Sequence, residues 1–396
     1  MSRRVVVVGA GVTGSAVAAE LAGVEGVQVV LVERGPGDRL VGSTGHAPGF
    51  VGVLGESPVL TGLARLSTDV YEGLHAHGKP GFDRVGGLEV ARSAGGWAQL
   101  ERRAALAEQA ALPHRLLDPE QTVRAAPDLV DPDGCTGGLW FERDGTARAR
   151  VVTAALRQRA TSTGVRVLHG TAVTAVDDSG PAPLTVRTSA GDLPADDVVL
   201  AAGLWGRQVA AMAGVHLPMV PVAHPYVHGP VRPAAARRSP FVRWPEHHVY
   251  ARDHGDRLGL GSYDHAPVRA PLEDLGTGAE LPWTADFEAV VERASRLLPS
   301  AQRFTVQTRL NGVFAMTPDN QPLLGPAAGV PGLWIAQALW VTHAAGAARC
   351  LVSAMTGGAP PVPGLASLLP DRFAGQPDDR LEEQALRLYR DIYATG

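Results

Sequence analysis

Three glycines near the start of the chain have the spacing of a loop that binds a dinucleotide. Residues 5–8 are all valine, as in a strand buried on both faces, and Gly9, Gly11 and Gly14 follow at once in the pattern GxGxxG. The first glycine permits a tight turn, the second lets backbone approach a pyrophosphate, and the third lets a helix pack on the strand. We therefore expect phosphates at the amino end of a helix over residues 15–21.

An acidic residue completes this motif. Residues 27–32 form a second apolar run, and Glu33 ends it, where a carboxylate can bond the hydroxyl groups of an unphosphorylated ribose. Strand, helix, strand and acid together predict one nucleotide-binding half of an α/β domain. The GxGxxG pattern by itself does not distinguish FAD from NAD.

A histidine stands in a glycine-rich loop just downstream. Residues 42–49 read GSTGHAPG, with His46 as the only titratable group among them. The pairing of this loop with a dinucleotide motif indicates a flavin that is attached covalently to the imidazole of His46. The alternative is a loop histidine that stacks on a non-covalent cofactor.

Composition limits the class of protein. A chain of 396 residues exceeds one ordinary core, so we expect two domains. The net charge of −4 argues against nucleic acid as a partner. No run of about 18 apolar residues is present, so we expect no membrane-spanning helix.

Lysine, cysteine and histidine chemistry is restricted. Lys79 is the single lysine, so a Schiff-base mechanism would have to use it. Cys135 and Cys350 form no motif and suit a reducing cytosol. His224 and His228 are four residues apart, but a strand would separate them by about 13 Å, and no nearby carboxylate or cysteine completes a site. We therefore expect no metal.

The remaining pattern indicates two interleaved domains. Helices are expected at residues 60–74, 96–111, 149–160, 285–298 and 378–393, with another that opens at 340–346. Strands are expected at 86–90, 165–168, 171–176, 197–203, 218–228, 249–252, 258–263 and 333–338. We assign the nucleotide domain to residues 1–80, 146–212 and 311–358, the second domain to 81–145 and 213–310, and a C-terminal extension to 359–396.

An ordered set of motifs resembles the flavin portion of the dimethylglycine oxidase, dimethylglycine dehydrogenase and sarcosine dehydrogenase family. The loop at 42–49 resembles the family segment GST-x-HAPG, in which the histidine is joined to the 8α carbon of FAD. The other matching segments are GGLEVA at 86–91, AHxYV at 223–227, HGDR at 254–257, GSY at 261–263, NGVF at 311–314, TPDxxPLLG at 317–325 and WVTH at 340–343. They span nearly the whole chain.

The resemblance implies the fold and the cofactor. The fold would be α/β plus α+β: a glutathione-reductase-type FAD-binding domain with an interleaved substrate domain on a mostly antiparallel sheet. Besides Gly9, Gly11, Gly14, Glu33 and His46, the implied cofactor contacts are Val12, Thr13, Arg34, Ser43, Thr44, Gly45, Phe50, Val173, Gly203, Trp340, Val341, Thr342 and His343. The folate-binding domain that follows in bacterial dimethylglycine oxidases is expected to be missing.

The resemblance also assigns an active site. His224 matches the family's active-site histidine, and an imidazole titrates near pH 6.5, close to where amine chemistry occurs; a structural histidine is the alternative. Tyr250 stands at about the place of the active-site tyrosine. The family carries two adjacent aromatics where this chain has Tyr250 and Ala251, and a shift of one residue reverses the face of a strand. Arg252 is a candidate clamp for a substrate carboxylate, or a solvated charge.

The implied activity is flavin-dependent oxidation of a small secondary or tertiary amine in the cytosol. A hydride would pass from an N-methylated amino acid, such as dimethylglycine or sarcosine, to N5 of FAD. The resulting iminium would hydrolyse, releasing formaldehyde if an N-methyl group was oxidised. Molecular oxygen or an electron-transfer flavoprotein would accept the electrons. The alternatives are a specialised-metabolism oxidase of bulkier amines and a non-catalytic FAD-binding subunit.

Overall fold

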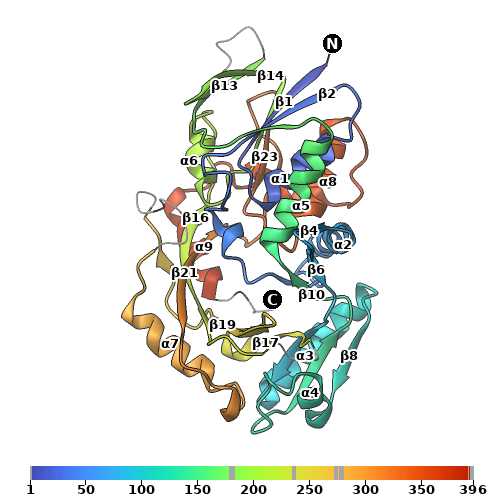
Figure 1. The fold of residues 1–396 in the computed structure, drawn as a ribbon, viewed down its shortest axis with the longest axis vertical. Helices are drawn as coiled ribbons and strands as arrows, with labels where there is room; N and C mark the ends of the chain where they lie inside the picture. Colours follow the sequence, from blue (N-terminus) through green and yellow to red (C-terminus); the bar gives the residue numbers. More distant parts are fainter. Residues whose placement is uncertain are drawn as a thin grey trace.

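The structure is a computed structural model that describes residues 2–177, 183–233, 238–271, 275, 281–390 and 392. These residues form two lobes, each built on a sheet (Figure 1). The upper lobe in Figure 1 holds the N-terminal strands, and the lower lobe holds most of the second sheet. The chain passes repeatedly between the lobes, in agreement with the interleaved α/β plus α+β fold predicted from the sequence.

The upper lobe contains a six-stranded sheet in which every neighbouring pair is parallel except the last. In spatial order its strands are β11 (Arg166–Leu168), β2 (Val27–Val32), β1 (Arg3–Val8), β15 (Asp197–Leu200), β23 (Leu333–Gln337) and β22 (Leu323–Pro326). β1 lies in the middle, which explains why its valines are apolar on both faces.

The two faces of this sheet pack against different layers. Val5 and Val7 pack against helices α1 (Val12–Leu21), α5 (Ala149–Ser162) and α8 (Ala344–Met355). Val6 and Val8 face a small antiparallel sheet of β12 (Val173–Asp177), β13 (Leu184–Thr188) and β14 (Gly191–Ala195). The four consecutive valines therefore fill two separate cores.

The second sheet is mostly antiparallel, as predicted. Its strands run β20 (Val268–Arg269), β16 (Val220–His228), β19 (Leu258–Ser262), β18 (Val249–Asp253), β17 (Phe241–Trp244), β7 (Gly87–Ala91), β9 (Gly137–Phe141) and β8 (His114–Leu117), with β21 (Thr308–Met316) also paired to β16. Among the described strand pairs of this sheet, β7 and β17 are parallel and all the others are antiparallel.

One face of the second sheet is apolar and the other carries polar and aromatic groups. Val242, Val249 and Ala251 pack with helices α4 (Pro119–Ala125) and α7 (Ala285–Ser295). Strand side chains alternate between faces, so Arg243 and Tyr250 point the opposite way. This second face looks toward the upper lobe.

The remaining elements connect or cover these sheets. They are α2 (Pro58–Glu72), α3 (Ala94–Gln109), α6 (Gly206–Ala211), α9 (Asp378–Arg390), a sheet of β3 (Phe50–Val51), β10 (Gly145–Ala147) and β6 (Phe82–Asp83), and the pair β4 (His75–Ala76) and β5 (Lys79–Pro80). β21 continues to Met316, so the chain leaves the second sheet later than the expected boundary at 311. The helix expected at 340–346 begins at Ala344, after a turn. The expected end of the last helix at Tyr393 lies outside the described residues.

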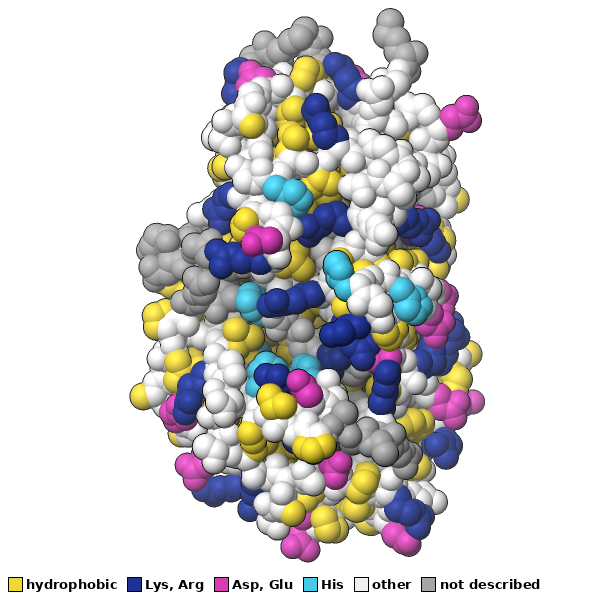
Figure 2. Space-filling model, in the orientation of Figure 1, with side chains coloured by type: hydrophobic (Ala, Val, Ile, Leu, Met, Phe, Trp, Pro, Cys, Tyr) yellow, Lys and Arg dark blue, Asp and Glu magenta, His cyan; other side chains and the backbone are white. Residues whose placement is uncertain are grey.

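The outer surface mixes charges of both signs. Figure 2 shows basic side chains gathered across the middle of one face, with acidic ones mostly nearer its edges. Since the chain has one lysine, these basic groups are almost all arginine. None of the described helices is long and apolar enough to cross a membrane.

Candidate active site

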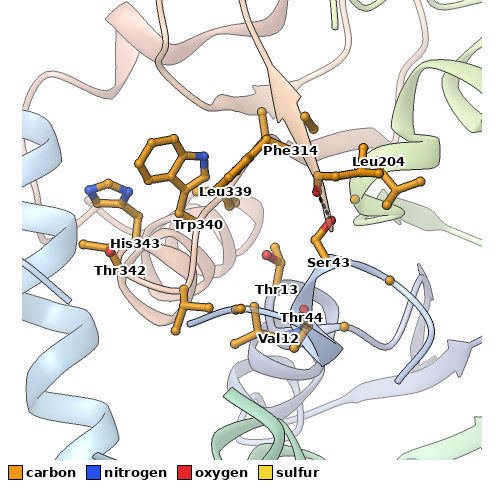
Figure 3. A pocket seen from close by; sticks show the side chains of 18 of the residues that line it. Val12, Thr13, Ser43, Thr44, Leu204, Phe314, Leu339, Trp340, Thr342 and His343 are labelled. Carbon is orange, nitrogen blue, oxygen red and sulfur yellow. Dashed lines mark hydrogen bonds between the residues drawn. The ribbon is translucent and has the colours of Figure 1, made fainter. Parts of the chain in front are cut away.

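A cavity of about 430 Å³ is lined by segments from both lobes. Its walls come from the fingerprint loop (residues 9–14), the histidine loop (residues 42–49), the turn before α8 and the polar face of the second sheet. In Figure 3, Val12 and Thr44 lie on one side of this space and Trp340 on the other. The volume is within the range of about 300–1,000 Å³ typical of cofactor and ligand pockets.

The fingerprint loop has the shape of a phosphate cradle. Gly9 has a φ of +100°, and a Cβ on Gly14 would lie 1.8 Å from the carbonyl oxygen of Gly9. The first turn of α1 carries no acidic side chain of its own, which leaves its positive dipole end suited to an anion. The Val12 N–H donates to the Thr44 hydroxyl at 3.2 Å, which joins this loop to the histidine loop.

Glu33 fixes the backbone around the expected ribose position. Its carboxylate accepts the N–H groups of Ala10 and Gly35, each at 2.7 Å, and it lines the cavity. A carboxylate has about four acceptor sites, so Glu33 retains the capacity to bind ribose hydroxyls. The guanidinium of Arg34 lies 4.5 Å from the centre of the Trp205 ring at the same end of the cavity.

The histidine loop is held by contacts from two sides. The Ser43 hydroxyl donates to the Val313 carbonyl at 2.8 Å (Figure 3), and Arg150 donates to the Gly45 carbonyl at 2.9 Å. His46 is half-buried and lines the cavity. The imidazole is therefore at the wall where covalent attachment was predicted, and the attachment itself stays a prediction.

Arg252 supports this loop from behind. Its guanidinium donates to the carbonyl oxygens of Pro48 and, at 3.1 Å, Ala147. The side chain is buried and is missing from the described residues that line the cavity. The structure therefore shows Arg252 in a different contact from the expected clamp for a substrate carboxylate, because its guanidinium is directed at two backbone carbonyl oxygens.

His224 and Tyr250, the two residues predicted to be catalytic, meet on the cavity wall. Nε2 of His224 lies 2.7 Å from the Tyr250 hydroxyl, and Nδ1 lies 2.7 Å from the Tyr389 hydroxyl of α9. Burial, and then the nearby His265, lowers the pKa of His224 well below its ordinary value. His224 is therefore neutral near pH 7, with one ring nitrogen as donor and the other as acceptor.

The orientation of Tyr250 depends on a glycine. Tyr250 is opposite Gly261 in the register of β18 and β19, and a Cβ on Gly261 would lie 2.3 Å from the Tyr250 ring. Ala251 packs in the apolar core on the other face. Of the two positions that the sequence left ambiguous, 250 is thus the one that faces the cavity.

A charged group adjoins Tyr250 in the same sheet. Arg243 is opposite Tyr250 in the register of β17 and β18, and Glu89 is opposite Arg243 in β7. Cross-strand partners share a face and have Cβ atoms about 5 Å apart. The guanidinium of Arg243 lies 4.4 Å from the centre of the Phe50 ring. Glu89, Arg243 and Tyr250 therefore form one row on the cavity side of the sheet.

Glu89 anchors two arginines at this end of the cavity. It is buried and bonds Arg103 at 2.6 Å and Arg243. Burial opposes its ionisation, but the two guanidinium groups outweigh burial and lower the pKa of Glu89. Asp144 and Glu56 also interact with these guanidiniums, but burial raises the pKa of both acids, that of Asp144 to about 7. With those two acids protonated, the two guanidiniums and the Glu89 carboxylate carry one excess positive charge, which suits a bidentate carboxylate ligand. Glu56 also lines this end.

Most of the predicted cofactor-binding residues line the cavity, and two glycines lie behind it. Gly14 packs on Gly9, and a Cβ on Gly45 would lie 2.3 Å from the Leu40 carbonyl oxygen. His343 precedes α8, and burial lowers its pKa to about 4. The predicted residues found in the wall are Gly9, Gly11, Val12, Thr13, Glu33, Arg34, Ser43, Thr44, His46, Phe50, Val173, Gly203, Trp340, Val341, Thr342 and His343.

Sequence reasoning missed a second group of wall residues. They are Glu89, Arg103, Tyr226, Phe241, Arg243, Tyr263 and Phe314. Period-two spacing offers a partial signal: Tyr226 follows His224 by two residues in β16, and alternation places both on one face. No local pattern could relate them to Glu89, which comes from a strand far away in the sequence.

The residues present fit FAD. A side chain at Gly9 or Gly14 would displace the backbone that shapes the phosphate cradle, since a Cβ on Gly9 would lie 2.5 Å from the Ala201 carbonyl oxygen and one on Gly14 would lie 1.8 Å from the Gly9 carbonyl oxygen. Glu33 lies where a ribose is expected, and the same cavity continues to His46 and the aromatic wall. Among the described side chains, no group of three or more His, Cys, Asp or Glu residues could hold a metal ion.

This combination defines a flavoprotein with a nucleotide-binding lobe and a substrate lobe. A family model described as DAO: FAD dependent oxidoreductase matches residues 4–354. The chain therefore belongs to this family of FAD-dependent oxidoreductases.

Named relatives and a solved structure agree with this assignment. The chain is 28% identical over 385 residues to mitochondrial dimethylglycine dehydrogenase of Rattus norvegicus, covering 93% of this chain and 44% of the relative. It is 28% identical over 340 residues to 4-methylaminobutanoate oxidase (formaldehyde-forming) of Paenarthrobacter nicotinovorans, covering 84% and 41%. The chain thus spans less than half of either relative. L-proline dehydrogenase from P. horikoshii has the same fold, with a TM-score of 0.81, 21% identity, and 94% and 98% of the two chains covered.

Proposed function

We propose that this chain is an FAD-dependent amine oxidoreductase whose substrates are short N-methylated amino acids such as dimethylglycine or sarcosine. The observation that carries the proposal is the row of Glu89, Arg243 and Tyr250 beside His224, in the same cavity as the fingerprint loop. A carboxylate bound to Arg243 would leave the amine of a short amino acid beside Tyr250, because the two positions are cross-strand partners. The names of the two relatives support this substrate class.

The chemistry requires a neutral amine next to the carbon that is oxidised. FAD, when bound, supplies at N5 the acceptor for a hydride equivalent from that carbon. Arg243 holds the carboxylate, and the hydroxyl of Tyr250, bonded to neutral His224, receives the hydrogen bond or proton of the amine. Water hydrolyses the resulting iminium, and formaldehyde leaves when the oxidised carbon was an N-methyl group.

We propose that His46 attaches FAD covalently through the 8α carbon. The histidine loop is tied to the second sheet through Ser43 and to α5 through Arg150, so the imidazole is held in place before the cofactor binds. Thr342 and His343, at the amino end of α8, would lie at the pyrimidine side of the flavin, where a helix N-terminus stabilises developing negative charge.

The attachment is tested by acid precipitation of the protein. We expect a yellow pellet from the wild type and a colourless pellet from His46→Ala. Thermal denaturation of His46→Ala with and without added FAD then shows whether that variant still binds the cofactor. A colourless wild-type pellet with yellow supernatant would contradict a covalent bond and leave the non-covalent alternative.

The substrate class is tested by anaerobic reduction of the bound flavin. Sarcosine or dimethylglycine should bleach the flavin and yield formaldehyde. Trimethylglycine is the matched control, since it has the same carboxylate but no nitrogen lone pair, and it should leave the flavin oxidised. Failure of every N-methyl amino acid to reduce the flavin would contradict the proposal. Reduction by a bulkier amine would then favour a specialised-metabolism oxidase, and reduction by no amine would favour a non-catalytic FAD-binding subunit.

We propose molecular oxygen as the electron acceptor. One of the two relatives is named an oxidase and the other a dehydrogenase, so their names do not decide the acceptor. The rate of flavin reoxidation by oxygen distinguishes the two kinds of enzyme. Reduced protein mixed with air-saturated buffer should recover its flavin colour rapidly and produce hydrogen peroxide. Slow recovery would instead indicate transfer to a partner flavoprotein.

A further inference from the structure

A continuous chain of hydrogen bonds leads away from Tyr250. The Tyr250 hydroxyl is 2.7 Å from Nε2 of His224, whose Nδ1 is 2.7 Å from the Tyr389 hydroxyl. The same hydroxyl of Tyr389 is 2.9 Å from Nε2 of His265, and Nδ1 of His265 is 2.7 Å from the Ala266 carbonyl oxygen. Side chains from β18, β16 and α9 thus connect the cavity wall to the loop after β19.

The last contact sets the direction of every hydrogen bond before it. The Ala266 carbonyl can only accept, so Nδ1 of His265 carries a proton. In neutral His265, Nε2 then accepts from Tyr389, which in turn accepts from Nδ1–H of His224. Nε2 of neutral His224 therefore accepts from Tyr250. All donors point from the cavity toward His265.

Burial differs between the two ends of the chain. Tyr250, His224 and Tyr389 are buried, whereas His265 is only half-buried. Burial lowers the pKa of both histidines, and more strongly for His224. A positive charge is thus less costly at the outer end. The titratable groups that face His224 are Tyr250, Tyr263 and Tyr389. Those that face His265 are Tyr389 and Asp264, and Asp264 forms an ion pair with Arg293.

We propose that this chain is a proton wire that carries the ammonium proton of the substrate from the cavity to His265, with Tyr389 of α9 as its middle relay residue. The inference rests on the proposed amine substrate. One proton would pass from the substrate nitrogen to the Tyr250 oxygen. At the same time the Tyr250 proton would move to Nε2 of His224, the Nδ1 proton of His224 to Tyr389, and the Tyr389 proton to His265. His265 gains the proton at Nε2 and then releases one to water. No electrons move, and the amine is left neutral.

α9 is placed for this role by one apolar face. Leu381, Ala385 and Tyr389 are the buried residues of this helix and recur every four positions, so they form one stripe. The helix packs against β16, which carries His224. Glu382 also binds Arg269 of β20 at 2.5 Å. Through Tyr389, α9 thereby contacts His224 of the cavity wall from behind.

The main test is Tyr389→Phe, which keeps the ring and removes the hydroxyl. Near pH 7 we expect anaerobic flavin reduction by sarcosine to slow by about 10- to 100-fold. The defect should shrink as the pH rises, because the substrate then arrives as a neutral amine. His265→Phe should behave in the same way. Glu382→Gln is the matched control: it weakens the attachment of α9 without touching the wire and should keep the wild-type pH profile.

Three kinetic results would overturn the wire. They are an unchanged pH profile in Tyr389→Phe, a defect that persists at high pH, and a defect that Glu382→Gln reproduces. A wild type that no amine reduces would contradict the proposed function separately.

The direction of the wire is also testable without turnover. ¹⁵N NMR of histidine-labelled protein, with His224 assigned by its loss in His224→Gln, should show a neutral ring protonated at Nδ1. A ring protonated at Nε2, or a charged ring, would overturn the wire whatever the activity.

Discussion

At the scale of single residues, Arg243 is the group that recognises the substrate in our proposal. We expect Arg243→Lys to lower kcat/KM for sarcosine by about 10-fold or more, because an ammonium cannot reproduce a planar bidentate contact with a carboxylate. The loss should appear mainly in KM, measured by steady-state kinetics. Arg296→Lys, in an exposed ion pair with Glu292, is the matched control. An unchanged KM in Arg243→Lys would place the carboxylate elsewhere.

A second residue-scale prediction concerns the space above Gly261. In Gly261→Ala the new methyl group would occupy the position of the Tyr250 ring, so Tyr250 must move away from His224. We expect flavin reduction to slow by about 10- to 100-fold, at a cost of about 1–3 kcal/mol in unfolding free energy. Stopped-flow reduction and urea denaturation measure the two effects. Gly73→Ala is the control, since nothing lies near the added carbon and φ is −85°. Equal rates of flavin reduction in the two variants would contradict a role for Tyr250 in that step.

At the scale of elements, the regular parts of the fold were predictable and the site was predictable only in part. The valines of β1, the glycines after it and Glu33 lie within one continuous stretch, so local pattern determines them. The row of Glu89, Arg243 and Tyr250 depends on the pairing of β7, β17 and β18, and strand order is not written in any one segment. Motif resemblance supplied His224 and Tyr250, but it said nothing of Tyr389.

The case of Arg252 shows the same limit. Alternation along β18 correctly puts Arg252 and Tyr250 on one face. The face alone does not say what covers the side chain, and here the histidine loop and β10 do so through the Pro48 and Ala147 carbonyls. Alternation alone therefore could not reveal these carbonyl contacts, because burial under another element is a tertiary property.

The attachment of the histidine loop to β21 yields an element-scale prediction. Ser43→Ala removes the hydroxyl that donates to the Val313 carbonyl, a contact of about 1 kcal/mol. If the loop must present His46 to the flavin, the fraction of covalently bound cofactor should fall, although the protein still folds. The ratio of flavin in the acid pellet to flavin in the supernatant measures this fraction. Ser162→Ala, at the end of α5 away from the cavity, is the control and should retain the wild-type ratio. A wild-type ratio in Ser43→Ala would mean that covalent attachment does not depend on the hydrogen bond between Ser43 and Val313.

At the scale of the whole molecule, the cavity lies where the two lobes meet. Its wall combines the first turn of α1, the turn before α8 and the polar face of the second sheet, and α9 completes the hydrogen-bonded chain behind it. His224 is buried and His228, His254, His265 and His343 are half-buried, and burial lowers the pKa of each. Stability of the folded protein should therefore depend on pH.

His254 gives this dependence a specific test. Burial, and then Arg252, lowers the pKa of His254 to about 2, and its Nε2 lies 2.8 Å from the Tyr226 hydroxyl. The unfolded chain binds a proton there near pH 6.5, so acidification favours unfolding. At about pH 5 this one residue should cost about 2 kcal/mol relative to neutral pH. In His254→Gln, which keeps an acceptor for Tyr226, urea denaturation at the two pH values should show a correspondingly smaller difference. The exposed His75→Gln is the control, and a difference in His254→Gln as large as in the wild type would mean that His254 is not buried in its neutral form.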